Sequence, residues 1–242
     1  MKAQQQQEKP ILFNQSMVKA IMNGNKTQTR RVMKPQPFGT ICKSPASPHG
    51  ILFSSDVYGD QEVQCPYGVK GNRLWVKEAF YAYGFWYKNG KTKTGKVKWN
   101  FKDCTERYKD NQYMYMDNPP DFVYTERIEK KIGWYKRNSL FMPRVASRLL
   151  LEIDSLAIQH VQQISEIDSN LEGISEFIVG GKSIGFGVED WLNDDSFQMR
   201  SSAVDAFHAL WDSINGNPLP GQPNYSWSEN PYVWVIEFKL LR

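Results

Sequence analysis

Residues 24–31 read Gly-Asn-Lys-Thr-Gln-Thr-Arg-Arg, where an amphipathic helix is expected to end and an extended segment to begin. Upstream, Asn14 and Ser16 offer N-cap oxygens, and apolar residues recur at helical spacing. Gly24 can turn left-handed and is the predicted end of that helix. Every later side chain of the stretch is polar or cationic, and the breaker Pro35 follows. We therefore predict a short, extended and partly exposed segment directly after the helix.

Four side chains of this stretch suggest chemistry. Side chains alternate along an extended segment, so Thr29 and Arg31 are expected on one face and Arg30 on the other. A threonine hydroxyl becomes a nucleophile when a neighbouring lysine of lowered pKa accepts its proton, which makes Lys26 and Thr29 a candidate pair. Arg30 and Arg31 would also suit phosphate oxygens, because guanidinium groups donate in a fork. The alternative is a solvated basic turn, since most Lys and Arg side chains lie at the surface.

Composition sets the general class of the protein. The chain has 242 residues, a net charge of +4 and 40% hydrophobic residues, enough to bury a sizeable core. Its pI of about 8.8 permits a nucleic-acid partner without requiring one. No apolar run approaches the ~20 residues that span a bilayer, and the polar start at residues 1–9 does not resemble a signal peptide. We expect a cytoplasmic protein with no membrane partner.

Metal and cofactor signatures are weak in this sequence. Cys42, Cys65 and Cys104 are odd in number and widely spaced, which argues against a disulfide scaffold and a structural zinc site. Cys42, His49 and Cys65 could in principle meet in the fold, so a metal site formed by these three residues stays an open alternative. Glycine-rich phosphate loops and a nucleophile elbow are absent from the sequence. No cofactor and no metal are expected.

The first half of the chain alternates between irregular and ordered segments. Residues 34–70 are rich in Pro, Gly and Ser and are predicted to be an irregular or hairpin insertion. Residues 74–81 are predicted as one strand, with Trp75 and Glu78 on opposite faces and Glu78 a surface carboxylate or a pocket residue. Residues 82–140 mix aromatic and basic side chains without a clear period. They are either a substrate-facing lobe or a solvated hairpin insertion.

The second half has clearer local signals. A short helix is predicted over 164–174, with Ser165 as its cap and Asp168 three residues later as the capping-box partner. Glu172 lies in the last turn of that helix. A carboxylate there opposes the helix dipole, so this position invites another explanation. Arg144 and Arg148 are expected to line the same cleft or to pair with acidic neighbours such as Glu152. The other expected elements are a loop over about 175–200, an amphipathic helix over 201–215 whose Trp211 is buried, and a closing strand over 232–240 that contains buried Trp234.

Together these elements predict an α+β protein. Strands outnumber helices and several are short, which favours a small mixed β-barrel flanked by helices. We expect one domain over 1–242, with two long insertions at about 34–70 and 82–140.

Four blocks of the chain occur in an order that resembles the ASCH domain family. They are Gly24-x-Lys26-x-x-Thr29-x-Arg31, Gly71-x-x-Leu74-x-Val76, the run into Ile164-Ser165-Glu166 and Glu172, and Val235-Ile236-Glu237-Phe238. The resemblance covers roughly 10–33, 71–81, 144–174 and 226–241. It implies a PUA-like β-barrel, an association with RNA, and insertions of the kind found in long phage and prophage members.

Within that family the site motif is similar to small bacterial amidohydrolases that remove the acetyl group from acetylcytidine. The resemblance implies Thr29 as nucleophile, Lys26 as its activating base or polarising cation, and Glu172 as the acid/base that positions water. The expected partner is a modified nucleoside or RNA. The residues expected to bind the substrate or nucleic acid are Arg30, Arg31, Arg144, Trp75 and Glu78.

Two alternatives remain at the level of sequence. One is a non-catalytic module in which Lys26, Arg30, Arg31 and exposed aromatic residues hold single-stranded RNA or DNA. The other, which the family resemblance implies, is ribonuclease activity at the same site, using Lys26 with a nearby tyrosine or carboxylate.

Overall fold

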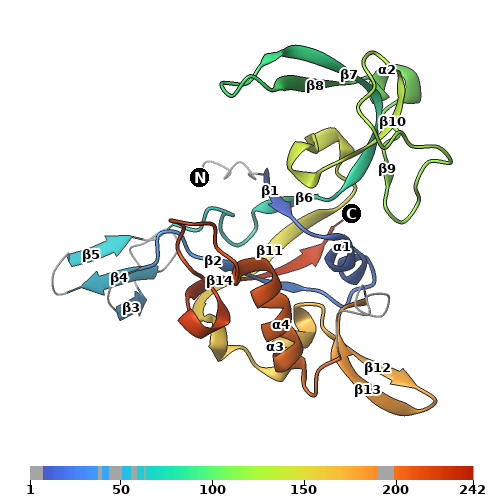
Figure 1. The fold of residues 1–242 in the computed structure, drawn as a ribbon. Coiled ribbons are helices and arrows are strands. Elements are labelled where there is room, and N and C mark those ends of the chain that lie inside the picture. The colour runs from blue at the N-terminus through green and yellow to red at the C-terminus, as the bar shows by residue number, and fades with distance from the viewer. Residues whose placement is uncertain are drawn as a thin grey trace, which may run out of the picture. The chain divides into compact units, whose positions relative to one another are not determined.

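The computed structural model describes residues 8–37, 40–43, 51–55, 59–62, 64–189 and 199–241, and it shows a mixed α+β protein (Figure 1). The chain divides into two compact units. Unit 1 comprises Met1–Lys9, Ser16–Leu74 and Leu151–Arg242, and unit 2 comprises Pro10–Gln15 and Trp75–Leu150. The segment predicted as an insertion at 82–140 makes up most of unit 2.

A five-stranded sheet has the order β1-β6-β11-β14-β2. Its long strand β14 runs antiparallel to both β11 and β2, and it pairs Ile236 with Thr29 and Trp234 with Arg31. The chain boundaries of the units fall within β1 (Glu8–Leu12) and β6 (Arg73–Lys77). The elements that lie wholly or mostly in unit 1 are α1 (Gln15–Met22), β2 (Gln28–Val32), β3 (Thr40–Lys43), β4 (Ile51–Ser55), β5 (Gly59–Glu62), β11 (Leu150–His160), α3 (Glu166–Leu171), β12 (Ser175–Val179), β13 (Lys182–Gly187), α4 (Ala203–Asn215) and β14 (Tyr232–Leu240).

The segment that follows α1 is extended and partly exposed, as predicted, but its exposed part is limited to the first residues and its strand is largely buried. The helix ends before Gly24, whose φ of +78° confirms the expected left-handed stop. Gln28, Thr29 and Arg30 are all buried. The solvated basic turn is therefore excluded for Lys26 and Arg30, because Lys26 is buried and Arg30 lies in strand β2, which pairs with β14 along its whole length.

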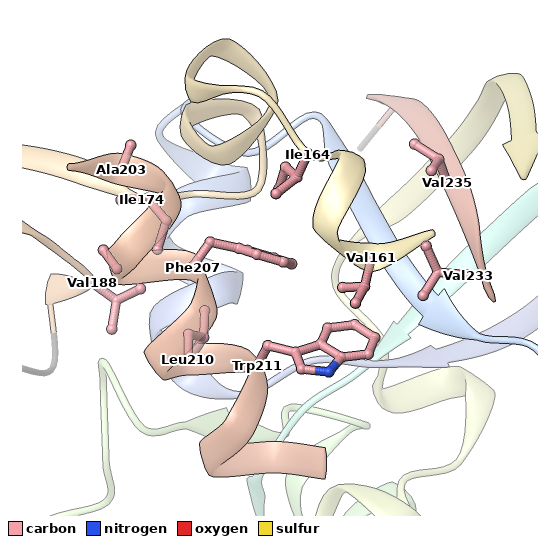
Figure 2. Packing of buried hydrophobic residues seen from close by; sticks show 11 residues of the cluster. Val161, Ile164, Ile174, Val188, Ala203, Phe207, Leu210, Trp211, Val233 and Val235 are labelled. Carbon is pink, nitrogen blue, oxygen red and sulfur yellow. The ribbon is translucent and has the colours of Figure 1, made fainter. Parts of the chain in front are cut away.

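Helix α4 contributes its apolar face to a hydrophobic cluster of unit 1 (Figure 2). Ser202 caps the helix by accepting a hydrogen bond from the backbone N–H of Asp205, and the apolar face lies inward. Trp211 is 4% exposed, and its indole N–H donates to the carbonyl of Tyr225 at 2.8 Å. The predicted helix and the buried Trp211 and Trp234 are confirmed. The cluster consists of Val161, Ile164, Ile174, Val188, Ala203, Ala206, Phe207, Leu210, Trp211, Val233 and Val235.

The loop predicted over 175–200 was wrong in its first part. Strands β12 and β13 form an antiparallel hairpin. Gly180 and Gly181 have φ of +59° and +78°, and two successive positive φ values are what a tight hairpin turn needs. The two adjacent glycines were the available signal. Residues 190–198 lie outside the described part of the chain.

The predicted insertion at 34–70 contains an antiparallel arrangement of β3, β4 and β5 at the level of the backbone, so the hairpin alternative fits its described part. The side chain of Cys42 and all of His49 lie outside the described residues. Cys65 is buried and unbonded to another cysteine. No helix in the described ranges combines the length and apolar character that a membrane crossing requires.

Unit 2 is built on a second antiparallel sheet. Its elements are β7 (Phe80–Lys91), β8 (Val97–Asp103), α2 (Thr105–Lys109), β9 (Met114–Tyr115) and β10 (Gly133–Arg137), with strand order β10-β7-β8 and β9 beside β7. The single strand predicted over 74–81 is in fact two strands, β6 and β7, separated by Glu78 and Ala79. Phe80, Ala82 and Met142 belong to the buried cluster of this unit.

Candidate functional site

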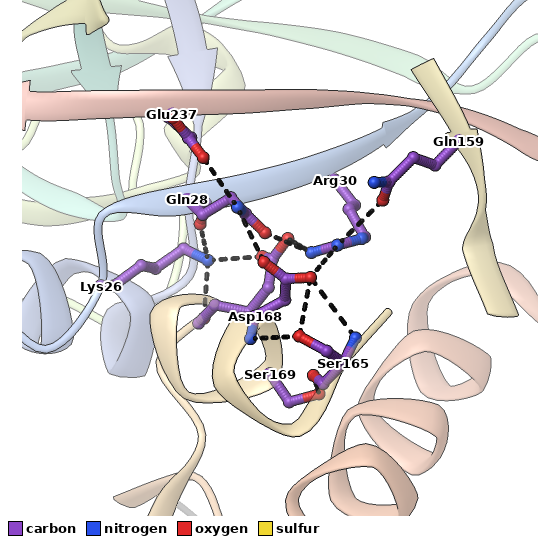
Figure 3. A network of polar contacts seen from close by, with 9 residues as sticks. Lys26, Gln28, Arg30, Gln159, Ser165, Asp168, Ser169 and Glu237 are labelled. Atoms are coloured by element: carbon purple, nitrogen blue, oxygen red, sulfur yellow. Dashed lines mark hydrogen bonds and ion pairs between the residues drawn. The ribbon is translucent and has the colours of Figure 1, made fainter. Parts of the chain in front are cut away.

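The ammonium group of Lys26 is buried at one side of a polar network in unit 1 (Figure 3). Its Nζ donates to Glu172 Oε2 at 2.8 Å, to the carbonyl of Glu172 at 2.6 Å and to the carbonyl of Gln28 at 2.8 Å. An ammonium group has three N–H donors, so these three bonds account for all of them. The Lys26 side chain is 0% exposed and that of Glu172 is 4% exposed.

The backbone brings these two residues together. Lys26 and Glu172 form an isolated antiparallel bridge, and the N–H of Thr27 donates to the carbonyl of Leu171 at 3.0 Å. Gly173 follows with a φ of +96°, and a Cβ there would lie 3.2 Å from the Cβ of Ala20. A glycine is needed at this point because the turn after α3 packs closely on α1.

Arg30 completes the network from strand β2. Its guanidinium contacts Glu172 Oε1 at 3.2 Å and Asp168 Oδ2 at 3.3 Å, and it also donates to the side chains of Gln28 and Gln159. Glu172 therefore holds Lys26 with one carboxylate oxygen and Arg30 with the other. The carboxylate that opposes the helix dipole at the end of α3 is explained by these two cations.

Burial changes the acid–base properties of the network. Desolvation lowers the pKa of Lys26 despite the attraction of Glu172. Burial also lowers the pKa of Arg31. Burial by itself would raise the pKa of Asp168, but hydrogen bonds from Ser165 and the charge of Arg30 hold that pKa below its ordinary value. The amine of Lys26 is thus easier to deprotonate than an exposed lysine.

Thr29 and Glu172 line one small pocket of about 80 Å³. Arg30 and Arg31 line it as well, and α4 contributes lining residues that include Phe207 and Trp211. Glu172 thus links the other two predicted catalytic residues, because it contacts Lys26 directly and lines the same pocket as Thr29. Lys26 itself lines a second pocket of about 530 Å³ beside Thr27 and Phe238.

The predicted binding residues Trp75, Glu78 and Arg144 belong to unit 2. Glu78 is 3% exposed, so its interpretation as a surface carboxylate was wrong. Both of its oxygens accept hydrogen bonds from Arg148 at 2.9 Å, and burial raises its pKa. Arg144 lies 6.0 Å from the ring of Trp75.

The acidic partner expected for Arg148 was also predicted wrongly. Arg148 binds Asp117 at 2.8 Å in addition to Glu78, whereas Glu152 pairs with Lys239 at 2.7 Å. Sequence distance misled here, because Glu152 is only four residues from Arg148 but occupies a different unit.

Sequence reasoning missed several members of the unit 1 network, among them Asp168 and Gln28. Asp168 was taken only as the capping-box partner of Ser165; this role is confirmed, but Asp168 also binds Arg30. Gln28 donates to Asp168 and Glu237 at 3.3 and 3.4 Å. Gln28 could have been identified only if its strand position had been predicted to be buried, because a buried polar side chain needs hydrogen-bond partners.

The described side chains include no group of three or more His, Cys, Asp and Glu residues arranged to hold a metal. The site offers an amine, a hydroxyl, two guanidinium groups and two carboxylates within unit 1.

Comparison with protein-family models, with curated proteins and with solved structures finds no match to this chain.

Proposed function

We propose that the chain is an ASCH-type protein with a PUA-like barrel in unit 1, and that its buried site hydrolyses an amide. The proposed substrate is an N-acylated, cytidine-like nucleoside, either free or in RNA. The observation that carries this proposal is the buried contact of 2.8 Å between Lys26 Nζ and Glu172 Oε2, with Glu172 in the same pocket as Thr29. A desolvated ammonium–carboxylate contact, whose carboxylate residue lines the same pocket as a buried threonine, supplies the groups that acyl transfer needs.

The first half-reaction forms an acyl-enzyme. The hydroxyl oxygen of Thr29 attacks the amide carbonyl carbon, and its proton passes to the Lys26–Glu172 pair. The tetrahedral oxyanion is stabilised by a guanidinium that lines the pocket, for which Arg31 is the candidate. The carbon–nitrogen bond then breaks, and the leaving amine takes the proton back from the pair. The acyl group remains on Thr29 as an ester.

The second half-reaction uses water. Glu172 accepts a proton from the water as it attacks the ester, and that proton passes to Thr29 as the carboxylic acid leaves. Because Lys26 and Glu172 are in direct contact, the two groups titrate as one coupled system.

The pocket size restricts what part of the substrate enters. A volume of about 80 Å³ is well below the roughly 300–1,000 Å³ typical of pockets that enclose a whole ligand. The acyl group and its amide would fit, while the nucleoside would stay outside or displace side chains of α4. This predicts that activity falls steeply as the acyl chain is lengthened.

The alternative function, a non-catalytic module in which Lys26, Arg30 and Arg31 bind single-stranded RNA or DNA, has less support. The cations of Lys26 and Arg30 are buried and already bind Glu172 and Asp168, so phosphates would have to displace internal partners. Ribonuclease activity at this site has no additional observation in its favour.

The test incubates the purified protein with N-acetylated cytidine and measures the release of cytidine by chromatography. Thr29→Ala should abolish turnover, and Thr29→Ser should restore part of it because the hydroxyl returns. Thr27→Ala is the matched control, since Thr27 lies two residues away and outside the pocket that Thr29 lines. If Thr29→Ala keeps the wild-type rate, or if Thr27→Ala loses as much, Thr29 is not the nucleophile. If a correctly folded wild-type protein releases no cytidine from any short-chain acyl substrate, the hydrolase proposal is wrong.

A further inference from the structure

The sheet of unit 2 has two different faces. Strand residues alternate between faces, so Phe80 and Ala82 lie on one side of β7 and the odd-numbered positions on the other. Phe80 and Ala82 are buried in the core of the unit. The opposite face, which we name the aromatic face, carries an aromatic residue at four consecutive outward positions of β7, namely Tyr81, Tyr83, Phe85 and Tyr87.

The neighbouring strands add basic and polar side chains to the aromatic face. Residues paired directly across an antiparallel sheet lie on the same face. In β10, Lys136 pairs with Tyr81 and Trp134 with Tyr83. In β8, Lys102 pairs with Phe85 and Asn100 with Tyr87. None of the eight residues at these positions is acidic.

Most rings of the aromatic face are half-buried; Tyr81 alone is buried. Tyr83 and Trp134 pack edge to face with ring centres 5.4 Å apart, and the ammonium of Lys109 from α2 lies 4.9 Å from the ring centre of Tyr83. Lys102 and Lys136 are exposed. Partly exposed rings held by a sheet and flanked by ammonium groups are a stacking platform with a positive border.

Charge distinguishes this part of the chain from the rest. Residues 82–140 contain thirteen Lys and Arg against seven Asp and Glu, a net charge of +6. The whole chain has a net charge of +4, so the remaining residues are slightly acidic, at −2. The positive charge of the protein is therefore concentrated in the segment that builds the aromatic face.

We propose that the aromatic face binds single-stranded nucleic acid. Bases stack on Tyr83, Phe85 and Tyr87, and the ammonium groups of Lys102 and Lys136 contact phosphates. A polyanion with flat, unpaired bases is the partner that complements both features, because each base presents a π-face and each phosphate a negative charge. A duplex hides those π-faces and is expected to bind more weakly. This proposal is independent of the hydrolase site in unit 1.

The test is fluorescence anisotropy of the full-length protein with labelled oligo-dT and oligo-U of about 15 nucleotides, a length that covers the usual site sizes. A duplex of the same length is the third probe. Both single strands should bind more tightly than the duplex, with an affinity that falls as salt rises. The ratio of the oligo-U and oligo-dT affinities shows whether RNA or DNA is preferred.

Variants separate stacking from charge. Tyr87→Leu and Phe85→Leu keep an apolar side chain on the sheet, and each should weaken single-strand binding by about 5- to 100-fold, the usual effect of losing one stacked base. Tyr87→Phe should bind as the wild type does. The control is Phe122→Leu, which removes a ring that is 63% exposed elsewhere in the unit and should change nothing.

The charge test compares two lysines of the same strand pair. Lys102→Ala should reduce the slope of log affinity against log salt by about 0.7, the value for one phosphate of a single strand. Lys88→Ala removes the same charge from the opposite face, where Lys88 pairs with Trp99, and should leave the slope unchanged. The proposal is overturned if single strands do not bind, if they bind no better than the duplex, or if the two control variants lose as much affinity as the test variants.

Discussion

Replacing Lys26 with methionine tests whether the buried ion pair holds strand β2 to the turn after α3. The substitution keeps the length of the side chain but removes three hydrogen-bond donors. The carboxylate of Glu172, 4% exposed, would then lose the cation that one of its oxygens holds and keep Arg30 on the other. Removing one member of a buried pair costs about 3–5 kcal/mol, and in a chain of this length each kcal/mol lowers Tm by roughly 2–4 °C. We therefore expect a Tm lower by about 6–20 °C.

Lys19→Met is the matched control because it makes the same substitution in the adjacent helix. Lys19 pairs with Glu189 at 3.2 Å, and both side chains are more than one-third exposed. An exposed pair of this kind contributes at most about 1 kcal/mol. Urea unfolding followed by circular dichroism gives the free energies, with each transition fitted separately if the units unfold apart.

The pH dependence gives a second measure of the same pair. Burial lowers the folded-state pKa of Lys26 below 10.5, so the unfolded chain binds more protons between the folded pKa and 10.5. The stability of the wild type relative to Lys26→Met should therefore rise with pH through that window. If Lys26→Met unfolds at the same urea concentration as Lys19→Met, and the difference is flat with pH, the ion pair does not hold this part of the fold together.

Three further predictions concern single positions. Arg148→Met leaves the carboxylate of Glu78 buried without its bidentate partner; urea midpoints should show a loss of about 3 kcal/mol at neutral pH. Because burial already raises the pKa of Glu78, part of that loss should be recovered as pH falls through the folded pKa, and a loss that grows in mild acid would contradict this. Gly173→Ala should cost about 1–2 kcal/mol by calorimetry, since φ is +96° and the added Cβ would lie 3.2 Å from Ala20; an unchanged Tm would show that the turn relaxes. Asp168→Asn should destabilise the protein at neutral pH, and acid titration should show the difference disappearing below the depressed folded pKa, where wild-type Asp168 is also protonated.

Local signals predicted several elements correctly. Helical spacing and Gly24 located α1 and its end, and the Ser165–Asp168 capping box located the start of α3. These features act over three or four residues, so sequence alone contains them. The adjacent glycines at 180–181 carried the same kind of signal for the β12–β13 hairpin, although the loop interpretation overlooked it.

Local sequence signals did not predict which residues are buried or which distant residues pair. A basic strand and a surface turn have the same composition, so only the sheet register with β14 shows that Thr29 and Arg30 are buried. Glu78 and Arg148 likewise pair across 70 positions, while the nearer Glu152 binds another lysine.

The sequence by itself predicted an α+β chain with the helices α1, α3 and α4, and it indicated Lys26, Thr29 and Glu172 as candidate site residues. The tertiary structure decided that Lys26 and Glu172, 146 positions apart, form one desolvated pair, and that Arg30 belongs to the same network. The physical reason is that periodicity and capping depend on neighbours along the chain. The pairing of buried charges depends on which segments exclude water together, and that is settled only when the sheet and helices pack.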